Sequence, residues 1–121
     1  MYKFNIRWYE LEKHIIIPHY NYEGELVGIR RRSLKKEDIK NKYMPETIDG
    51  ITYEHALGMN FYGIYENHEA IIKYKKAILV EGEKSVLLSD TYYGKNSIAL
   101  ATCGFNISDW QINILIKMGV E

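Results

Sequence analysis

The sequence predicts a mixed fold of helices and strands, in which an antiparallel β-hairpin precedes a parallel strand–helix–strand–helix unit. Two apolar segments on either side of Asn21-x-x-Gly24 predict the hairpin, because Asn and Gly adopt the backbone conformations that tight turns require. Further along, two short apolar segments enclose a helical pattern. A strand, a helix and a strand in so short a length indicate a right-handed parallel crossover.

Composition limits the class of protein. A chain of 121 residues forms one domain or two small subdomains that share a core. Its single cysteine, Cys103, excludes an internal disulfide and fits a reducing cytoplasm. The sequence has no apolar run long enough to cross a bilayer and does not open with a signal-peptide pattern. Sixteen basic residues balance sixteen acidic ones, so net charge does not argue for nucleic acid. We therefore expect a cytoplasmic protein without a membrane segment.

The first half of the chain is expected to form strands. Residues 14–20 predict a strand that lies near a sheet edge, because Pro18 cannot donate a hydrogen bond to a neighbouring strand. Residues 26–29 predict the return strand, in which Gly28 indicates a bulge or a close approach of another group. Pro45 favours an extended conformation at Met44.

A basic cluster follows the hairpin, with five cations within seven residues. If the return strand continues through residues 29–32, Arg30 and Arg32 share one face and Arg31 points to the other. Arginine forks bind phosphates well, although a solvated sheet face has the same pattern. Lys42 beside Tyr43 could contact a phosphate and stack on a base.

The second half has clearer boundaries. Residues 66–75 predict a helix, with acids early and lysines late. Residues 77–80 are wholly apolar and predict a strand buried on both faces. Residues 83–93 predict a helix closed by Gly94, and residues 97–101 a second buried strand. A last helix begins at Ser108, where Gln111 completes a capping box.

The acidic turn after the first of these strands is the best candidate for chemistry. Glu81 stands at the carboxyl end of the strand, where open α/β sheets bind ligands. Glu81 and Glu83 bracket Gly82, which lets the backbone turn sharply and a ligand approach. Carboxylates so placed can hold Mg²⁺, but a two-metal site needs more of them. The histidines show no zinc-site spacing, and Cys103 is expected to be a packing residue.

Six segments, in this order, resemble the catalytic core of bacterial and phage DnaG-type DNA primases. They are Ile15-Ile16-Ile17-Pro18 with Asn21-x-x-Gly24, the strand ending in Arg32, Lys42-Tyr43-Met44-Pro45-Glu46-Thr47, Phe61-Tyr62-Gly63-Ile64-Tyr65-Glu66, Leu79-Val80-Glu81-Gly82, and Ala101-Thr102-Cys103-Gly104 followed by a capped helix. The resemblance covers residues 14–121, and the Glu-Gly segment is similar to the first motif of the Toprim fold.

The resemblance implies a basic N-terminal subdomain over residues 1–75 and a partial Toprim subdomain over residues 76–121. The family's Asp-x-Asp strand would fall beyond Glu121, and its zinc-binding and helicase-contacting regions are absent. Ser85 stands where many Toprim proteins carry an acid. We therefore expect a piece of a primase from a phage or mobile element that is inactive alone.

The family's activity is the synthesis of short RNA primers on single-stranded DNA from ribonucleoside triphosphates. The resemblance implies that Glu81 is catalytic, that Glu81 and Glu83 bind Mg²⁺ or Mn²⁺, and that a replicative helicase is a partner of the complete protein. The residues implied to bind nucleotide or DNA are Arg30, Arg32, Lys42, Tyr43, Gly82 and Lys84. Two alternatives remain open: a Toprim nuclease or topoisomerase-like piece, and a non-catalytic nucleic-acid-binding module.

Overall fold

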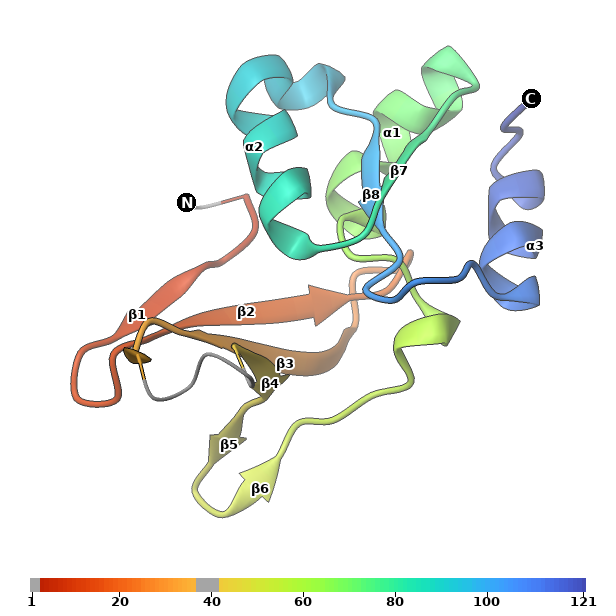
Figure 1. Cartoon of the computed structure of the whole chain (residues 1–121). Helices are drawn as coiled ribbons and strands as arrows, with labels where there is room; N and C mark the ends of the chain where they lie inside the picture. Colours follow the sequence, from red (N-terminus) through yellow and green to blue (C-terminus); the bar gives the residue numbers. More distant parts are fainter. Residues whose placement is uncertain (1–2, 37–41) are drawn as a thin grey trace. The chain divides into compact units, whose positions relative to one another are not determined.

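The computed structural model describes residues 3–36 and 42–121 (Figure 1). These residues form two compact units. Unit 1 comprises residues 1–19 and 26–55, and unit 2 comprises residues 20–25 and 56–121. The predicted boundary after residue 75 concerns the subdomains of a family and stays a prediction.

Unit 1 is built on a four-stranded sheet with the strand order β1-β2-β3-β4. The strands are β1 (Arg7–Tyr9), β2 (His14–Tyr20), β3 (Leu26–Ser33) and β4 (Tyr43–Pro45). β1 runs antiparallel to β2, and β3 runs antiparallel to β4. A small hairpin of β5 (Thr47–Ile48) and β6 (Ile51–Thr52) follows. The predicted β-hairpin architecture of the first half is therefore confirmed.

The turn between β2 and β3 forms as the sequence predicts. The amide oxygen of Asn21 accepts hydrogen bonds from the backbone N–H groups of Glu23 and Glu25, at 3.1 and 2.9 Å. Gly24 has a φ of 87°, a left-handed conformation that side chains rarely adopt. The turn is therefore stabilised by its own residues, as expected of Asn and Gly in a hairpin.

Pro18 and Gly28 occupy the positions that their chemistry requires. β2 lies inside the sheet, but β1 pairs only with His14, Ile15 and Ile16. The prediction that this strand lies near a sheet edge is therefore wrong, because β2 has a neighbouring strand on each side, and Pro18 is tolerated since it lies past the residues that pair with β1. A Cβ atom on Gly28 would come within 2.1 Å of His55 Nδ1, which confirms the predicted close approach.

Unit 2 contains the predicted parallel strand–helix–strand–helix arrangement. Its elements are α1 (Ile64–Tyr74), β7 (Ile78–Val80), α2 (Glu83–Tyr93), β8 (Ala99–Ala101) and α3 (Asp109–Lys117), with 3₁₀ turns at η2 (Leu57–Met59) and η3 (Gly94–Asn96). β7 and β8 pair in parallel, and Figure 1 shows α2 and α3 flanking them. Gly94 ends α2 with a φ of 54°, as predicted. No helix among the described residues is long and apolar enough to cross a membrane.

The core of unit 2 joins α1, β8 and α3. Its buried members are Phe61, Ile64, Ile71, Leu100 and Met118. All three residues of β8 are buried, which confirms the prediction for this strand.

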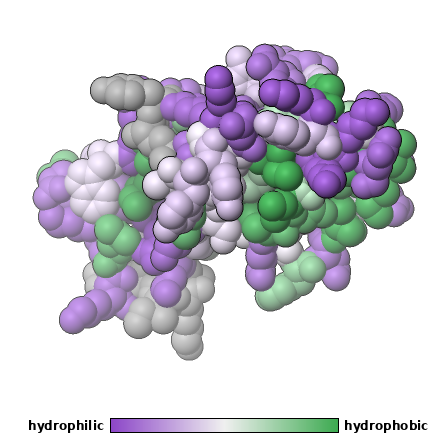
Figure 2. All heavy atoms as spheres, turned by 90° about the horizontal axis from the view of Figure 1, so that it is seen from above, coloured by the Kyte–Doolittle hydropathy of each residue, from purple (hydrophilic) through white to green (hydrophobic). Residues whose placement is uncertain are grey.

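β7 differs from the prediction of a strand buried on both faces. Ile78 is 54% exposed and Leu79 is 41% exposed. The physical reason is that β8 is the only strand paired with β7 among the described residues, so the other edge of β7 is uncovered. Figure 2 shows hydrophobic residues gathered on part of the drawn face, and the exposed apolar residues of unit 2 include Ile116 on α3.

The predicted capping box of α3 is confirmed. Ser108 Oγ accepts from the Gln111 backbone N–H at 3.1 Å, and Gln111 Oε1 accepts from the Ser108 N–H at 2.9 Å. The Gln111 side chain is fully buried, and its Nε2 donates to the backbone oxygen of Asn60 at 2.8 Å. Gln111 therefore both caps the helix and ties it to the loop after η2.

Candidate active site and basic surface

The parallel pair places Glu81 at the carboxyl edge of its sheet. Val80 is paired with Ala101, so Glu81 and Thr102 leave the two strands side by side. The backbone pairing continues past the strands, because Thr102 N–H donates to Val80 O at 2.9 Å and Cys103 N–H donates to Glu81 O at 2.8 Å. Ligands of open α/β sheets bind at this edge.

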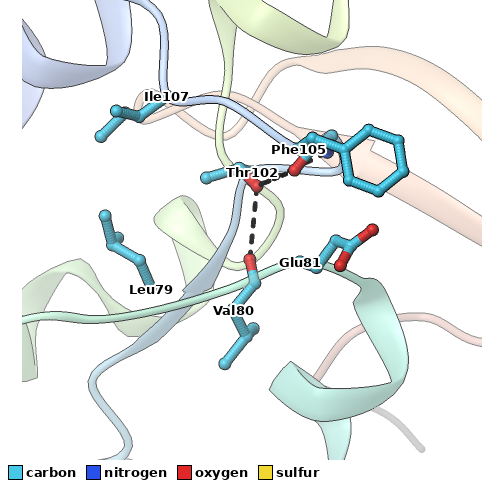
Figure 3. Close-up of a pocket in the computed structure, with 7 residues that line it drawn as sticks. Leu79, Val80, Glu81, Thr102, Phe105 and Ile107 are labelled. Atoms are coloured by element: carbon cyan, nitrogen blue, oxygen red, sulfur yellow. Dashed lines mark hydrogen bonds between the residues drawn. The ribbon is translucent and has the colours of Figure 1, made fainter.

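A cleft of about 310 Å³ opens at this edge of the sheet (Figure 3). Its lining residues are Leu79, Val80, Glu81, Thr102, Gly104, Phe105 and Ile107. The carboxylate of Glu81 and the ring of Phe105 lie on the same side of the cleft in Figure 3. The cleft thus combines an exposed acid with apolar walls.

The turn after β8 shapes one wall of the cleft. Thr102 Oγ1 donates to Gly104 O at 2.8 Å, and Cys103 has a φ of 59°. This left-handed conformation is uncommon for a side chain other than Asn or Asp. Thr102 and Phe105 were not among the predicted site residues, although their place directly after a strand that pairs with β7 is the signal that could have found them.

Gly82 is an ordinary residue in its backbone conformation. Its φ of −127° and ψ of 165° are extended values that any residue adopts, so the backbone here does not use the conformational freedom that the prediction of a sharp turn assigned to Gly82. Among the residues that the structure describes, no atom outside Gly82 and its two chain neighbours lies within 4 Å of the place where a Cβ would stand. Gly82 is the N-cap residue of α2, and the space before the helix is open to an approaching group.

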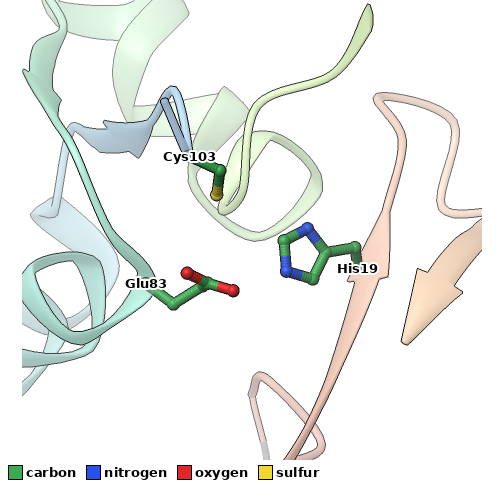
Figure 4. A group of neighbouring side chains, drawn as sticks. All are labelled: His19, Glu83 and Cys103. Atoms are coloured by element: carbon green, nitrogen blue, oxygen red, sulfur yellow. The ribbon is translucent and has the colours of Figure 1, made fainter. Parts of the chain in front are cut away.

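Glu83 lies in surroundings that differ from those of Glu81. It is 2% exposed and does not line the cleft, whereas Glu81 is exposed. A carboxylate oxygen of Glu83 and Sγ of Cys103 lie within 4.8 Å of each other (Figure 4). Burial, helped by the nearby Glu66 and Glu83, raises the pKa of the Tyr62 hydroxyl above its usual range.

A basic surface lies on unit 1, where β3 and β4 pair. Arg32 is opposite Tyr43, and Arg30 is opposite Pro45. The guanidinium carbons of Arg30 and Arg32 lie 5.6 and 5.9 Å from the centre of the Tyr43 ring, within the range of cation–π interaction. The structure therefore brings together three of the predicted residues, which we call the Arg30–Tyr43–Arg32 surface.

Arg31 confirms the predicted alternation along β3. Its Nη1 lies 3.9 Å from Oε1 of Glu46. Glu46 is buried, and its Oε2 lies 2.6 Å from Nε2 of the buried His14. This buried pair was not predicted, and no local sequence signal marks it, because His14 and Glu46 are 32 positions apart.

The two predicted lysines are exposed. Lys42 precedes Tyr43, and its backbone oxygen accepts from the Ser33 N–H at 2.8 Å. Lys84 lies in the first turn of α2 and does not line the cleft.

Comparisons with known proteins place these features in context. The chain matches no family model. It is 41% identical, over 109 residues, to the SPbeta prophage-derived uncharacterized protein YorJ of Bacillus subtilis. That match covers 88% of this chain and 29% of YorJ, so the chain spans less than a third of this relative.

Solved structures of primases share the fold. The Aquifex aeolicus primase, solved with its zinc-binding and RNA polymerase domains, superposes with a TM-score of 0.69 at 27% identity, over 88% of this chain and 25% of that one. A DnaG primase catalytic domain bound to ssDNA superposes with a TM-score of 0.64 at 26% identity, over 88% of this chain and 32% of that one. The RNA polymerase domain of Mycobacterium tuberculosis DnaG superposes with a TM-score of 0.69 at 23% identity, over 98% of this chain and 39% of that one.

The order of the elements agrees with these likenesses: a β-hairpin sheet in unit 1 and a parallel strand–helix–strand–helix unit in unit 2. In fold and in sequence, the chain corresponds to a part of the catalytic core of DnaG-type primases.

Proposed function

We propose that this chain supplies part of a primase catalytic core, which in its complete form makes short RNA primers on single-stranded DNA. The observation that carries the proposal is the exposed Glu81 at the carboxyl edge of a parallel strand pair, in a chain with a primase-core fold. The likeness to a DnaG catalytic domain bound to ssDNA supports the same class of partner. The prophage-derived relative supports a phage or mobile-element source.

In this proposal Glu81 either binds a divalent ion or assists proton transfer from the attacking hydroxyl. Phosphoryl transfer depends on positioning and on stabilising negative charge, and a bound Mg²⁺ or Mn²⁺ would supply the positive charge that stabilises it. Mg²⁺ accepts one or two carboxylates and keeps several waters, so the single exposed carboxylate of the cleft fits one side of such an ion. Because Glu83 is buried and does not line this cleft, the proposal rests on Glu81 and keeps Glu83 as a predicted ligand.

One carboxylate does not complete a two-metal site. We therefore infer that the chain by itself does not synthesise primers, and that the remaining ligands belong to an Asp-x-Asp strand elsewhere in the complete protein. A replicative helicase would likewise be bound through other regions. Gly82 and Lys84, at the open N-terminus of α2, would face the phosphates of a ribonucleoside triphosphate.

The Arg30–Tyr43–Arg32 surface and Lys42 would bind the phosphates of template or nucleotide. A fluorescence-anisotropy titration of the chain with a labelled single-stranded oligonucleotide, repeated at several salt concentrations, tests this. Arg30→Ala and Arg32→Ala should each weaken binding several-fold and lower the salt slope by about 0.7. Arg31→Ala is the matched control, because it removes the same charge from the opposite face of β3. Equal losses for all three variants would contradict the proposed surface.

A separate measurement tests the metal. Calorimetric titration of ATP into the chain, with and without Mg²⁺, should show a Mg²⁺-dependent component that Glu81→Gln removes. Glu69→Gln, an exposed change on α1, should leave that component intact. Binding that ignores both Mg²⁺ and Glu81 would overturn the catalytic proposal.

A non-catalytic nucleic-acid-binding module is the second candidate, favoured by the single carboxylate in the cleft. It predicts oligonucleotide binding without a Mg²⁺-dependent nucleotide site. A Toprim nuclease or topoisomerase-like piece has less support, because a Toprim module does not require the unit 1 hairpin sheet.

A further inference from the structure

We propose that Phe105 is a stacking platform for the nucleobase of a nucleotide held at the Glu81 cleft. This inference rests on the proposed function and adds to it a residue that contacts the base. It concerns unit 2 alone, because every residue that lines the cleft belongs to that unit.

The first observation is the exposure of the ring. Phe105 is 94% exposed, although burying such a side chain would stabilise a fold. Single exposed apolar residues are common, but this one lines a cleft next to an exposed acid. The ring is therefore available at a place where open α/β sheets bind ligands.

The second observation is how the ring is presented. The hydroxyl of Thr102 donates to Gly104 O at 2.8 Å and lies 3.5 Å from Gly104 N. Cys103 N–H donates to Glu81 O at 2.8 Å, with Cys103 in the left-handed conformation. These bonds fix the turn from Thr102 to Gly104, so that the residue after it projects from a constrained backbone. An aromatic side chain has only two rotatable bonds, so it loses little conformational entropy when a ligand stacks on it.

The third observation is the chemistry around the ring. Leu79 and Ile107 add partly exposed apolar surface to the cleft, and Glu81 adds one carboxylate. A nucleotide complements this combination: its base has a flat apolar face, and its phosphates meet an acid through a divalent cation. The cleft volume of about 310 Å³ is at the lower end of the range for small-ligand sites. Every base has a π face, so the platform would not select one base.

The experiment compares two ligands that differ only in the base. ATP and ribose 5-triphosphate, each with Mg²⁺, are titrated calorimetrically into the full chain. Phe105→Ala should weaken ATP binding about tenfold and leave ribose 5-triphosphate unchanged, and Phe105→Trp should retain ATP binding. Tyr92→Ala removes another exposed aromatic, on α2 and outside the cleft lining, and should change neither ligand.

Each other outcome has a definite meaning. If Phe105→Ala binds ATP as the wild type does, or binds both ligands more weakly by the same factor, the proposal that Phe105 stacks on the base is wrong. The proposed nucleotide site at Glu81 is not affected by that result. That result would mean that Phe105 is a surface residue without a ligand, or a residue that another segment of a longer protein covers. If the wild type binds neither ligand, the proposed function and the platform fail together.

Discussion

Tyr43 and Arg32 face each other across β4 and β3, and the guanidinium carbon of Arg32 lies 5.9 Å from the centre of the Tyr43 ring. Arg30, two residues earlier on the same face of β3, lies 5.6 Å from that ring. One half-buried aromatic ring therefore lies beside two cations, and Arg32 Nη1 also donates to the backbone oxygen of Ser33 at 2.7 Å. This arrangement turns a basic stretch of sequence into an ordered surface.

Two replacements of Tyr43 should distinguish the contribution of its ring to oligonucleotide binding from that of its hydroxyl. Tyr43→Phe keeps the ring face, and we expect oligonucleotide binding near that of the wild type. Tyr43→Ala removes the ring that lies beside both guanidinium groups and offers a face for a base, and we expect binding to weaken about threefold to tenfold. Fluorescence anisotropy at fixed salt measures both variants. Equal binding by Tyr43→Ala and the wild type would show that the ring does not order the arginines.

The buried pair of His14 and Glu46 should stabilise unit 1. The atoms Nε2 and Oε2 lie 2.6 Å apart, and Glu46 Oε1 also accepts from the Thr47 N–H at 2.9 Å. Glu46→Ala removes the carboxylate that lies beside the buried His14 and the acceptor of the Thr47 N–H, so we expect the free energy of unfolding to fall by about 3 kcal/mol. Urea unfolding measures this loss.

The exposed Glu54→Ala is the control and should change the unfolding free energy by less than about 0.5 kcal/mol. A double-mutant cycle with His14→Ala isolates the pair. If the two losses simply add, then the close contact contributes no coupling, and Glu46 acts through its other partners, Arg31 and the Thr47 N–H.

Local signals in the sequence account for much of the fold. Asn21 and Gly24 predict a turn that depends on their own backbone, and Ser108 with Gln111 predicts a cap that depends on four consecutive residues. The alternation of Arg30, Arg31 and Arg32 follows from strand geometry alone. Such features need no knowledge of distant neighbours, and the structure confirms them.

The features that were missed depend on distant neighbours. The apolar run of β7 predicts burial, but burial requires covering elements, and the described residues provide one strand partner. Glu81 and Glu83 are two positions apart, yet the start of α2 buries one and exposes the other. Phe105 has no motif, and its place in the cleft follows from the pairing of β8 with β7.

Gln111 should stabilise α3 beyond the effect of its cap. Its Nε2 bonds Asn60 O at 2.8 Å from a fully buried position. Gln111→Leu leaves that oxygen and the Ser108 N–H without this partner, so we expect a loss of about 2 kcal/mol in the free energy of unfolding. Ser108→Ala, which removes the other half of the box, should cost about 1 kcal/mol. Urea unfolding followed by circular dichroism compares them, and an equal or smaller loss for Gln111→Leu would contradict the buried role.

Tyr62 should make the stability of unit 2 depend on pH in the alkaline range. Its hydroxyl is buried near Glu66 and Glu83, which raises its pKa in the folded chain above the value near 10 of the unfolded chain. The folded state therefore keeps a proton that the unfolded state releases above about pH 10. Stability from this group is fully present below that pH and falls above it, by up to about 1.4 kcal/mol per pH unit.

The comparison of two slopes tests this effect, because other tyrosines and lysines titrate in the same range in both proteins. Urea unfolding of the wild type and of Tyr62→Phe should be measured from about pH 9 to pH 11. The absolute stability of Tyr62→Phe also reflects the lost hydroxyl contacts, so the change with pH is the informative quantity. We expect the wild type to lose stability more steeply than Tyr62→Phe above about pH 10. Parallel curves would mean that Tyr62 ionises in the folded chain as readily as in the unfolded one, contrary to its burial beside two carboxylates.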